Sequence, residues 1–180
     1  MIPKIYECLG KDPHRPIFDY ALVTKEHTVA TDAHILVEHS TEELFGKEFV
    51  AHVPEEGLLL GGDALRDMAK KDVEDIILTD QITVLHRKGQ KAIFEFRKHG
   101  DLDIYPNWKA VIPSIDDNKM VMAMGIDAKK LLRLQNALGI DQVGTKCYFT
   151  GEKTSILCYP MVNDMFPSAR GLIMPMMITY

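Results

Sequence analysis

The fold is decided by the stretch Tyr105-Pro106-Asn107-Trp108-Lys109-Ala110-Val111-Ile112-Pro113, which separates two halves of similar pattern. It contains the only tryptophan of the chain and two prolines seven residues apart. Each proline removes a backbone donor and biases the preceding residue toward extended geometry. We therefore predict an extended segment that crosses between the halves. The alternative is a proline-punctuated linker whose Trp108 packs in a core.

The first half begins with a strand-like pattern. A run of β-branched and aliphatic residues predicts a hairpin over residues 17–39, with its turn at Lys25-Glu26-His27. Residues 40–47 are predicted to form a loop or a single helical turn, and Phe49–Pro54 a short strand.

A helix with one apolar face is predicted next. Asp63 is a good N-cap, and Leu65, Met68, Ala69 and Val73 follow at helical spacing. Three short strands are expected after this helix, at Asp75–Thr79, Ile82–Arg87 and Lys91–Arg97.

The second half repeats this order. We predict a strand at Lys119–Met124 and then a helix that Asp127 caps and Gly139 ends, with Leu134 and Leu138 on its apolar stripe. Strands are expected near Gln142–Phe149, Thr154–Tyr159 and Gly171–Ile178.

The order strand–helix–strand–strand–strand thus occurs twice, which predicts an α+β fold with helices on one face of an antiparallel sheet. We expect one domain over residues 17–180. It would consist of a first unit at about 17–104, the crossing segment 105–118 and a second unit at 119–180. Residues 1–16, with three prolines, are expected to be an irregular arm.

Composition excludes several classes of protein. With 46% apolar and 26% charged residues, the chain is not a disordered one. No apolar run approaches the roughly 18–20 residues that span a bilayer, and the N-terminus lacks a secretory leader, so we expect a cytoplasmic protein. The net charge of −5 argues against coating of nucleic acid by bulk charge, although a local basic face is compatible with it.

The three cysteines lack the spacing of a metal site. An odd number of cysteines without a leader favours buried, reduced thiols. A second arrangement stays open, in which Cys147 and Cys158 face each other on neighbouring strands.

Three segments carry a family resemblance. In chain order they are Ala30-Thr31-Asp32-Ala33-His34-Ile35-Leu36, the segment Tyr105–Pro113, and Gly171-Leu172-Ile173-Met174-Pro175-Met176-Met177-Ile178. They are similar to the Ala-Thr-Asp-Gly-His-Arg-Leu, aromatic-Pro-Asp-Tyr-Arg-Arg-Val-hydrophobic-Pro and Val-Val-Met-Pro-Met-Arg-Leu stretches of bacterial β sliding clamps, the processivity rings of DNA polymerases. Ala33, Ile35 and Met177 depart from the family's Gly, Arg and Arg.

The resemblance implies the DNA-clamp fold, whose domains contain two β-α-β-β-β units, and a non-enzymatic role without cofactor or metal. A clamp subunit has three domains and closes a ring with a second subunit, whereas this chain has material for one domain. A ring of single domains would need about six copies around double-stranded DNA. Otherwise the chain is a clamp-fold protein that never closes a ring.

The resemblance also implies a hydrophobic groove for short peptides of DNA polymerase or other clients. Aliphatic walls and adaptable Met side chains suit varied apolar anchors. By position, the groove residues are Thr31, His34, Leu36, Pro106, Val111, Leu172, Ile173, Met174, Pro175 and Met176. The alternative is that the last of these segments is simply a buried terminal strand.

In clamps the helices point basic residues at DNA phosphates. The corresponding residues are Arg66, Lys70, Lys71, Lys129, Lys130 and Arg133. Asp67, Asp72 and Glu74 reduce the positive charge of the first helix, so the second is the better candidate. The alternative is an ordinary solvated helix face.

The hypothesis derived from these patterns is a processivity or DNA-metabolism accessory factor that tethers clients. One rival is a solitary clamp-fold interaction module without ring closure or DNA contact. Another is an enzyme or metal site that uses Asp32 and His34, which strand alternation would place on one side, although no third ligand is evident.

Overall fold

The computed structural model describes residues 1–102, 104–113, 124–139, 144–151, 154–161 and 165–176. In these ranges the α-helices are α1 (Thr41–Ala51), α2 (Gly62–Met68) and α3 (Ala128–Leu138). Short 3-10 turns are η1 (Ile5–Cys8), η2 (Pro16–Asp19), η3 (Arg87–Gly89) and η4 (Trp108–Val111). The strands are β1 (Tyr20–Val23), β2 (His27–Thr31), β3 (Ile35–Ser40), β4 (Leu58–Gly61), β5 (Val73–Leu78), β6 (Ile82–His86), β7 (Lys91–Phe94), β8 (Arg97–Lys98), β9 (Thr145–Tyr148), β10 (Ile156–Pro160) and β11 (Arg170–Ile173).

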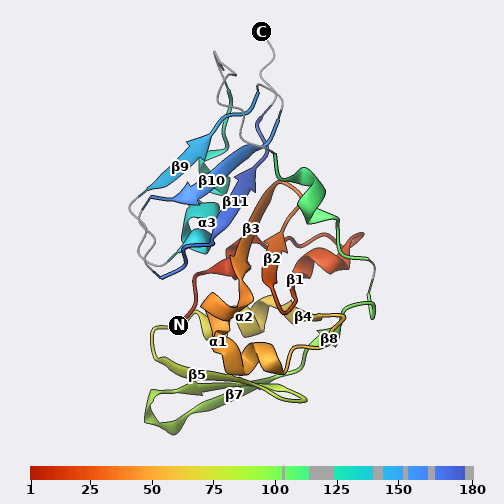
Figure 1. Ribbon diagram of the computed structural model, residues 1–180, viewed down its shortest axis with the longest axis vertical. Coiled ribbons are helices and arrows are strands. Elements are labelled where there is room, and N and C mark those ends of the chain that lie inside the picture. The colour runs from red at the N-terminus through yellow and green to blue at the C-terminus, as the bar shows by residue number, and fades with distance from the viewer. Residues whose placement is uncertain (103, 114–123, 140–143, 152–153, 162–164, 177–180) are drawn as a thin grey trace.

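Within the described ranges the strands form two antiparallel sheets (Figure 1). The larger sheet has the order β8-β4-β1-β2-β3-β11-β10-β9, and the smaller has the order β5-β6-β7. Every neighbouring pair of named strands is antiparallel. The predicted α+β class, with helices packed on antiparallel sheet, is therefore confirmed.

The pairing of β3 with β11 joins the two halves of the chain. Leu36 lies opposite Leu172 in this pair. At one end the Arg170 guanidinium binds the carboxylate of Glu38, and beyond the other end the Met174 N–H donates to the His34 carbonyl at 2.8 Å. Both ends of this pair are therefore held in register.

The two faces of the larger sheet carry different layers. Val37 and Ile173 point to one face and pack with the three helices in the main core. Leu36 and Leu172 point to the other face, where they pack with Trp108. This is the period-two alternation of strand side chains.

A glycine lets α3 approach the sheet closely. A Cβ added at Gly171 would lie 2.6 Å from Leu134 Cδ1 and 2.7 Å from the Leu36 carbonyl oxygen. Both distances are shorter than a carbon can accept, so a side chain at Gly171 would push the helix off β11.

The order strand–helix–strand–strand–strand is present in the first unit, but its strands divide between the sheets. This unit is β4-α2-β5-β6-β7, but its first strand is Leu58–Gly61 and not the predicted Phe49–Pro54, and β4 joins the larger sheet. The smaller sheet buries Leu78, Ile82 and Val84 in the main core and leaves Ile77 and Ile93 exposed. In Figure 1 it lies at the lower end of the molecule, below α1 and α2.

The second unit agrees with the prediction where it is described. Asp127 Oδ1 accepts hydrogen bonds from the backbone N–H groups of Lys129 (2.9 Å) and Lys130 (3.2 Å), and Gly139 follows the last residue of α3. The Lys130 and Lys129 N–H groups hold the pKa of Asp127 below its ordinary value. The strand predicted at Lys119–Met124 lies, except for Met124, outside the described residues.

Helix α1 was not predicted. The sequence favoured a loop at 40–47 and a strand at Phe49–Pro54, but the structure has one kinked helix there. Ser40 caps it by accepting from the Glu43 N–H at 3.5 Å, the spacing of a capping box. Gly46, at φ 83° and ψ 166°, interrupts the helix and thereby obscures its periodicity.

Three further features of the first half differ from the prediction. A turn at 32–34 divides the run predicted as one strand into β2 and β3. Strand β4 was missed, since its continuous leucine run has no alternation. Helix α2 begins after Gly61 rather than after Asp63, and it ends at Met68.

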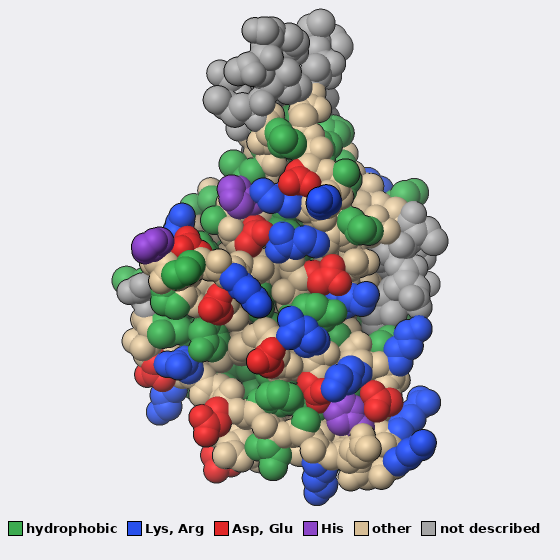
Figure 2. Space-filling model, turned by 180° about the vertical axis from the view of Figure 1, so that it is seen from behind, with side chains coloured by type: hydrophobic (Ala, Val, Ile, Leu, Met, Phe, Trp, Pro, Cys, Tyr) green, Lys and Arg blue, Asp and Glu red, His purple; other side chains and the backbone are tan. Residues whose placement is uncertain are grey.

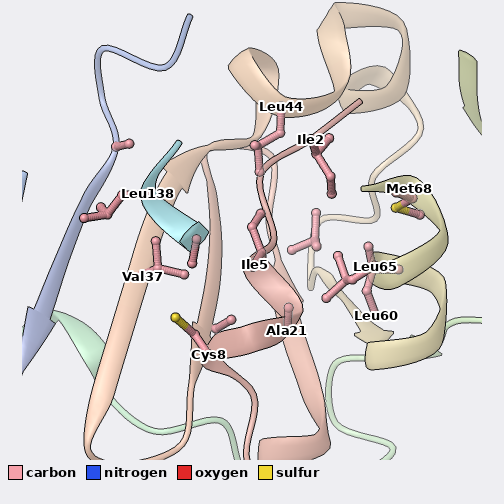
Figure 3. Packing of buried hydrophobic residues seen from close by; sticks show 14 of the residues in the cluster. Ile2, Ile5, Cys8, Ala21, Val37, Leu44, Leu60, Leu65, Met68 and Leu138 are labelled. Atoms are coloured by element: carbon pink, nitrogen blue, oxygen red, sulfur yellow. The ribbon is translucent and has the colours of Figure 1, made fainter. Parts of the chain in front are cut away.

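The N-terminal segment packs as a wedge between helices. Ile2, Ile5 and Cys8 are buried, and Figure 3 shows Ile5 between Leu65 of α2 and Val37 of β3. Backbone hydrogen bonds anchor the segment to both neighbours, from the Ile2 N–H to Met68 and from the Lys4 N–H to Asn136 of α3. The irregular arm expected at 1–16 therefore contributes part of the main core.

A buried histidine makes stability depend on pH. His39 is fully buried, its Nε2 lies 2.7 Å from the Ala137 carbonyl oxygen, and its Nδ1 has no hydrogen-bond partner among the described residues. Burial lowers the pKa of His39 to about 4. The unfolded chain, with a pKa near 6.5, binds this proton first as the pH falls.

We predict that the protein loses stability as the pH falls from about 6.5 toward 4, with about 2 kcal/mol lost from this group between pH 7 and pH 5. His39→Gln keeps an N–H donor for Ala137 but cannot titrate. Urea unfolding of both proteins at pH 7 and pH 5 should show the free-energy difference between them shrinking by that amount. An unchanged difference would contradict a neutral buried His39.

Candidate functional site

An apolar groove lies on the face of the larger sheet that the helices leave free. It has a volume of about 330 Å³. The residues that line it are Arg15, Phe18, Thr31, Ala33, Ile35, Leu36, Pro106, Asn107, Trp108, Val111, Leu172 and Met174. We call it the β3–β11 groove, because the pair Leu36 and Leu172 lies at its base.

Trp108 forms a fixed wall of this groove. Its side chain is almost completely buried, and its ring meets the ring of His27 edge to face, with centroids 5.3 Å apart. His27 Nδ1 lies 2.9 Å from Glu38 Oε1, and Glu38 also binds Arg170. The buried carboxylate is thus paired on both sides, as a buried charge requires.

Hydrogen bonds hold the segment that carries Trp108 across the sheet. The Tyr105 hydroxyl donates to the Val29 carbonyl at 3.0 Å, and the Ser155 hydroxyl donates to the Val111 carbonyl at 3.1 Å. These two bonds attach the segment to β2 and to the residue before β10, so the groove wall is positioned by both halves of the chain.

The structure brings six of the ten predicted groove residues together. Those that line the groove are Thr31, Leu36, Pro106, Val111, Leu172 and Met174. Ile173 does not line it, because strand alternation turns its side chain into the main core. His34 contributes its backbone carbonyl to Met174 while its side chain is exposed. Pro175 and Met176 lie past the end of β11, where Met176 bridges to Gly125.

The turn at 32–34 forms the rim of the groove. Asp32 Oδ1 accepts from the His34 and Ile35 N–H groups, both at 2.9 Å, and its Oδ2 lies 3.0 Å from Arg133 Nη2. The idea that Asp32 and His34 share one side of a strand is therefore wrong, since both belong to a turn. Asp32 Oδ1 therefore closes the turn, while Oδ2 connects the turn to α3.

Sequence reasoning missed several lining residues. Phe18, with the Arg15 guanidinium 5.4 Å from its ring centroid, lies in the segment that was expected to begin the hairpin. Trp108 was singled out but not assigned to the groove. Its place beside Pro106 in the crossing segment was the one available signal, because contacts between distant segments leave no trace in local periodicity.

The six basic residues assigned to the DNA side have different environments. Arg66 Nη1 lies 2.8 Å from Asp63 Oδ1, and Lys70 binds Asp67. Arg133 Nε donates to the Glu7 carbonyl at 2.6 Å, in addition to its contact with Asp32. By contrast, Lys71 and Lys129 are exposed and Lys130 is half-buried.

Asp67 contacts a histidine as well as Lys70. His86 Nε2 lies 2.7 Å from Asp67 Oδ2, and this contact raises the pKa of His86 above its ordinary value. Lys70 therefore belongs to a local charge cluster. Figure 2 shows that on the face opposite the view of Figure 1, acidic and basic side chains are intermixed.

Metal-binding clusters and membrane-spanning helices are absent from the described ranges. No group of three or more His, Cys, Asp or Glu side chains there is arranged to hold a metal ion. No described helix has both the length and the apolar character that a bilayer crossing requires.

Solved structures share this fold. A DNA polymerase sliding clamp from Bacillus subtilis superposes with a TM-score of 0.60 at 15% identity, covering 99% of this chain and 64% of that one. A DNA polymerase III β subunit from Bartonella birtlesii, bound to griselimycin, gives 0.61 at 14% identity, with 97% and 64% covered. The β chain from Streptococcus pneumoniae gives 0.59 at 12% identity, with 97% and 62% covered.

These likenesses confirm the predicted clamp fold, and at such low identity they show the fold alone. No protein-family model and no curated protein sequence matches the chain. The chain spans less than two thirds of the length of these three clamps.

The turn that forms the groove rim carries conformational strain. Ala33 has φ 71°, in the left-handed region that costs an L-residue about 1–2 kcal/mol. It stands where the clamp motif has glycine. We predict that Ala33→Gly, normally a destabilising exchange, raises the free energy of unfolding by about 0.5–1 kcal/mol.

Ala51→Gly is the control for this exchange, because Ala51 is an exposed residue at the end of α1. We expect the control to lower stability by up to about 1 kcal/mol. Chemical denaturation of the wild type and the two variants measures these free energies of unfolding. A comparable loss of stability in both variants would show that Ala33 is unstrained.

Proposed function

We propose that this chain is a clamp-related tethering factor of DNA metabolism that binds apolar segments of client proteins in the β3–β11 groove. The observation that carries the proposal is the groove itself, where two strands from opposite halves and the Trp108 segment enclose an apolar space. We assign no catalytic residue to the chain.

The dimensions of the groove support a peptide as its ligand. A volume of about 330 Å³ is at the lower end for ligand sites, enough for a small number of apolar side chains. The rest of a bound peptide would extend past the lining residues Arg15 and Asn107. Met174 and Val111, which are 41% and 51% exposed, offer apolar surface that is not used by the core.

The second element of the proposal is DNA. The positions that support it are Lys71, Lys129 and Lys130, since Arg66, Lys70 and Arg133 bind acidic or carbonyl groups of the chain itself. With three cations available and a net charge of −5, direct affinity for DNA would be weak. Retention would then depend on self-association of several chains around the duplex.

The pairing of Arg66, Lys70 and Arg133 with groups of the chain itself also favours a second candidate function. In it the chain is a solitary clamp-fold interaction module, which keeps the peptide groove but closes no ring and contacts no DNA. Both candidates share the groove, and they differ in oligomeric state.

Peptide binding in the groove is tested by placing a charge at Met174, an exposed residue of its lining. Short random peptides displayed on phage would be selected against the wild-type chain, and a selected peptide would be titrated by fluorescence anisotropy. Met174→Glu should weaken its binding at least about tenfold, because an unpaired carboxylate would be buried beneath the peptide.

Met165→Glu is the matched control, since Met165 is 64% exposed and does not line the groove. Its affinity should equal that of the wild type. Equal affinity of all three proteins, or failure to select any peptide, would remove the groove from the proposal.

Ring formation is tested by light scattering over a concentration series, with and without circular duplex DNA. The first candidate predicts a species of about six chains that DNA stabilises, weakened when Lys129→Glu and Lys130→Glu are combined. A monomer or dimer that is indifferent to DNA would contradict it and leave the solitary module.

A further inference from the structure

Two of the three cysteines form a pair at the edge of the larger sheet. Cys147 of β9 and Cys158 of β10 are directly opposite in register, and their Sγ atoms lie 3.8 Å apart. The third, Cys8, is a buried residue of the N-terminal segment. The pair takes no part in the groove or in the proposed DNA contacts.

The backbone geometry of this pair suits a disulfide. Opposed residues in antiparallel strands have Cα atoms about 4.5–5.5 Å apart. Disulfides span about 4.4–6.8 Å between Cα atoms, so no strand has to move. The two sulfur atoms, 3.8 Å apart, need to approach by rotation of their side chains.

The two thiols are not equivalent. Cys147 is half-buried, whereas Cys158 is fully buried. The Cys158 thiol lies within hydrogen-bond distance of Cys147, which lowers the pKa of Cys147, and the same contact raises the pKa of Cys158. Cys147 is thus the accessible thiol with the greater thiolate fraction, the form that reacts with oxidants.

We propose that Cys147 and Cys158 form a reversible disulfide when the protein meets a peroxide, and that this bond joins the edge strand β9 covalently to β10. Cys8 takes no part in it, because burial raises the pKa of its thiol and no second cysteine is paired with it.

The reaction balances with hydrogen peroxide as the oxidant. The Cys147 thiolate attacks one peroxide oxygen, the O–O bond breaks, and Cys147 becomes a sulfenic acid as hydroxide leaves. The Cys158 sulfur then attacks the Cys147 sulfur, an S–S bond forms, and the sulfenic oxygen leaves as water with the Cys158 proton. In sum, two thiols and one peroxide give one disulfide and two waters, and a dithiol reductant restores the pair.

The test is intact mass and peptide mapping of the full chain after mild treatment with hydrogen peroxide, and in parallel with diamide, which spares methionine. We expect the loss of two hydrogen atoms, one remaining free thiol at Cys8, and a cross-linked peptide that contains Cys147 and Cys158. Dithiothreitol should return the original mass, and the oxidised protein should melt several degrees higher than the reduced one.

Cys8→Ser and Cys147→Ser are the paired variants. Cys8→Ser should form the same disulfide, leaving no free thiol, while Cys147→Ser should form none. Three free thiols after diamide, chiefly intermolecular dimers, or oxygen addition at Cys147 without the cross-link would each overturn the proposal. The wild-type map alone decides the matter if a variant fails to fold.

Discussion

The antiparallel pairing of β3 with β11 is the constraint on which the rest of the structure depends. It connects strands from opposite ends of the chain into one sheet and places Leu36 beside Leu172. Glu38 and Arg170 hold one end of the pair, and His34 and Met174 hold the other. Because side chains alternate along a strand, this one register sends Ile173 into the main core and Leu172 into the groove. A shift by one residue would exchange them and remove the groove.

The N-terminal segment connects this pairing to the helices. It lies between α2 and α3, and Arg133 of α3 reaches from the carbonyl of Glu7 to the carboxylate of Asp32 in the groove rim. Arg133, which the sequence assigned to the DNA side, thereby links the helix layer to the groove on the opposite face of the larger sheet. Half of the basic residues assigned to the DNA side are paired with acidic or carbonyl groups of the chain itself, so fewer cations are left for DNA than the sequence suggests.

Most of the helices and strands that depend on local sequence patterns were predicted from the sequence. Helix α3 was predicted with both ends, because Asp127 and Gly139 are direct signals of helix capping and termination. Helix α1 was missed because Gly46 interrupts its period, and β4 because a leucine run lacks alternation. Six groove residues followed from the motifs, but Phe18 did not, since its place depends on tertiary contacts. The division of the first unit between two sheets was also beyond local pattern, because it depends on which strands pair over a distance.

Among possible measurements, nuclear Overhauser contacts between a selected peptide and methyl-labelled protein test the central claim most directly, because they locate the bound peptide atom by atom. The β3–β11 groove predicts contacts from the apolar side chains of the peptide to the methyl groups of Met174, Leu36 and Leu172, and to the ring of Trp108. Contacts confined to another exposed apolar surface, such as Ile77 and Ile93 on the smaller sheet, would contradict it.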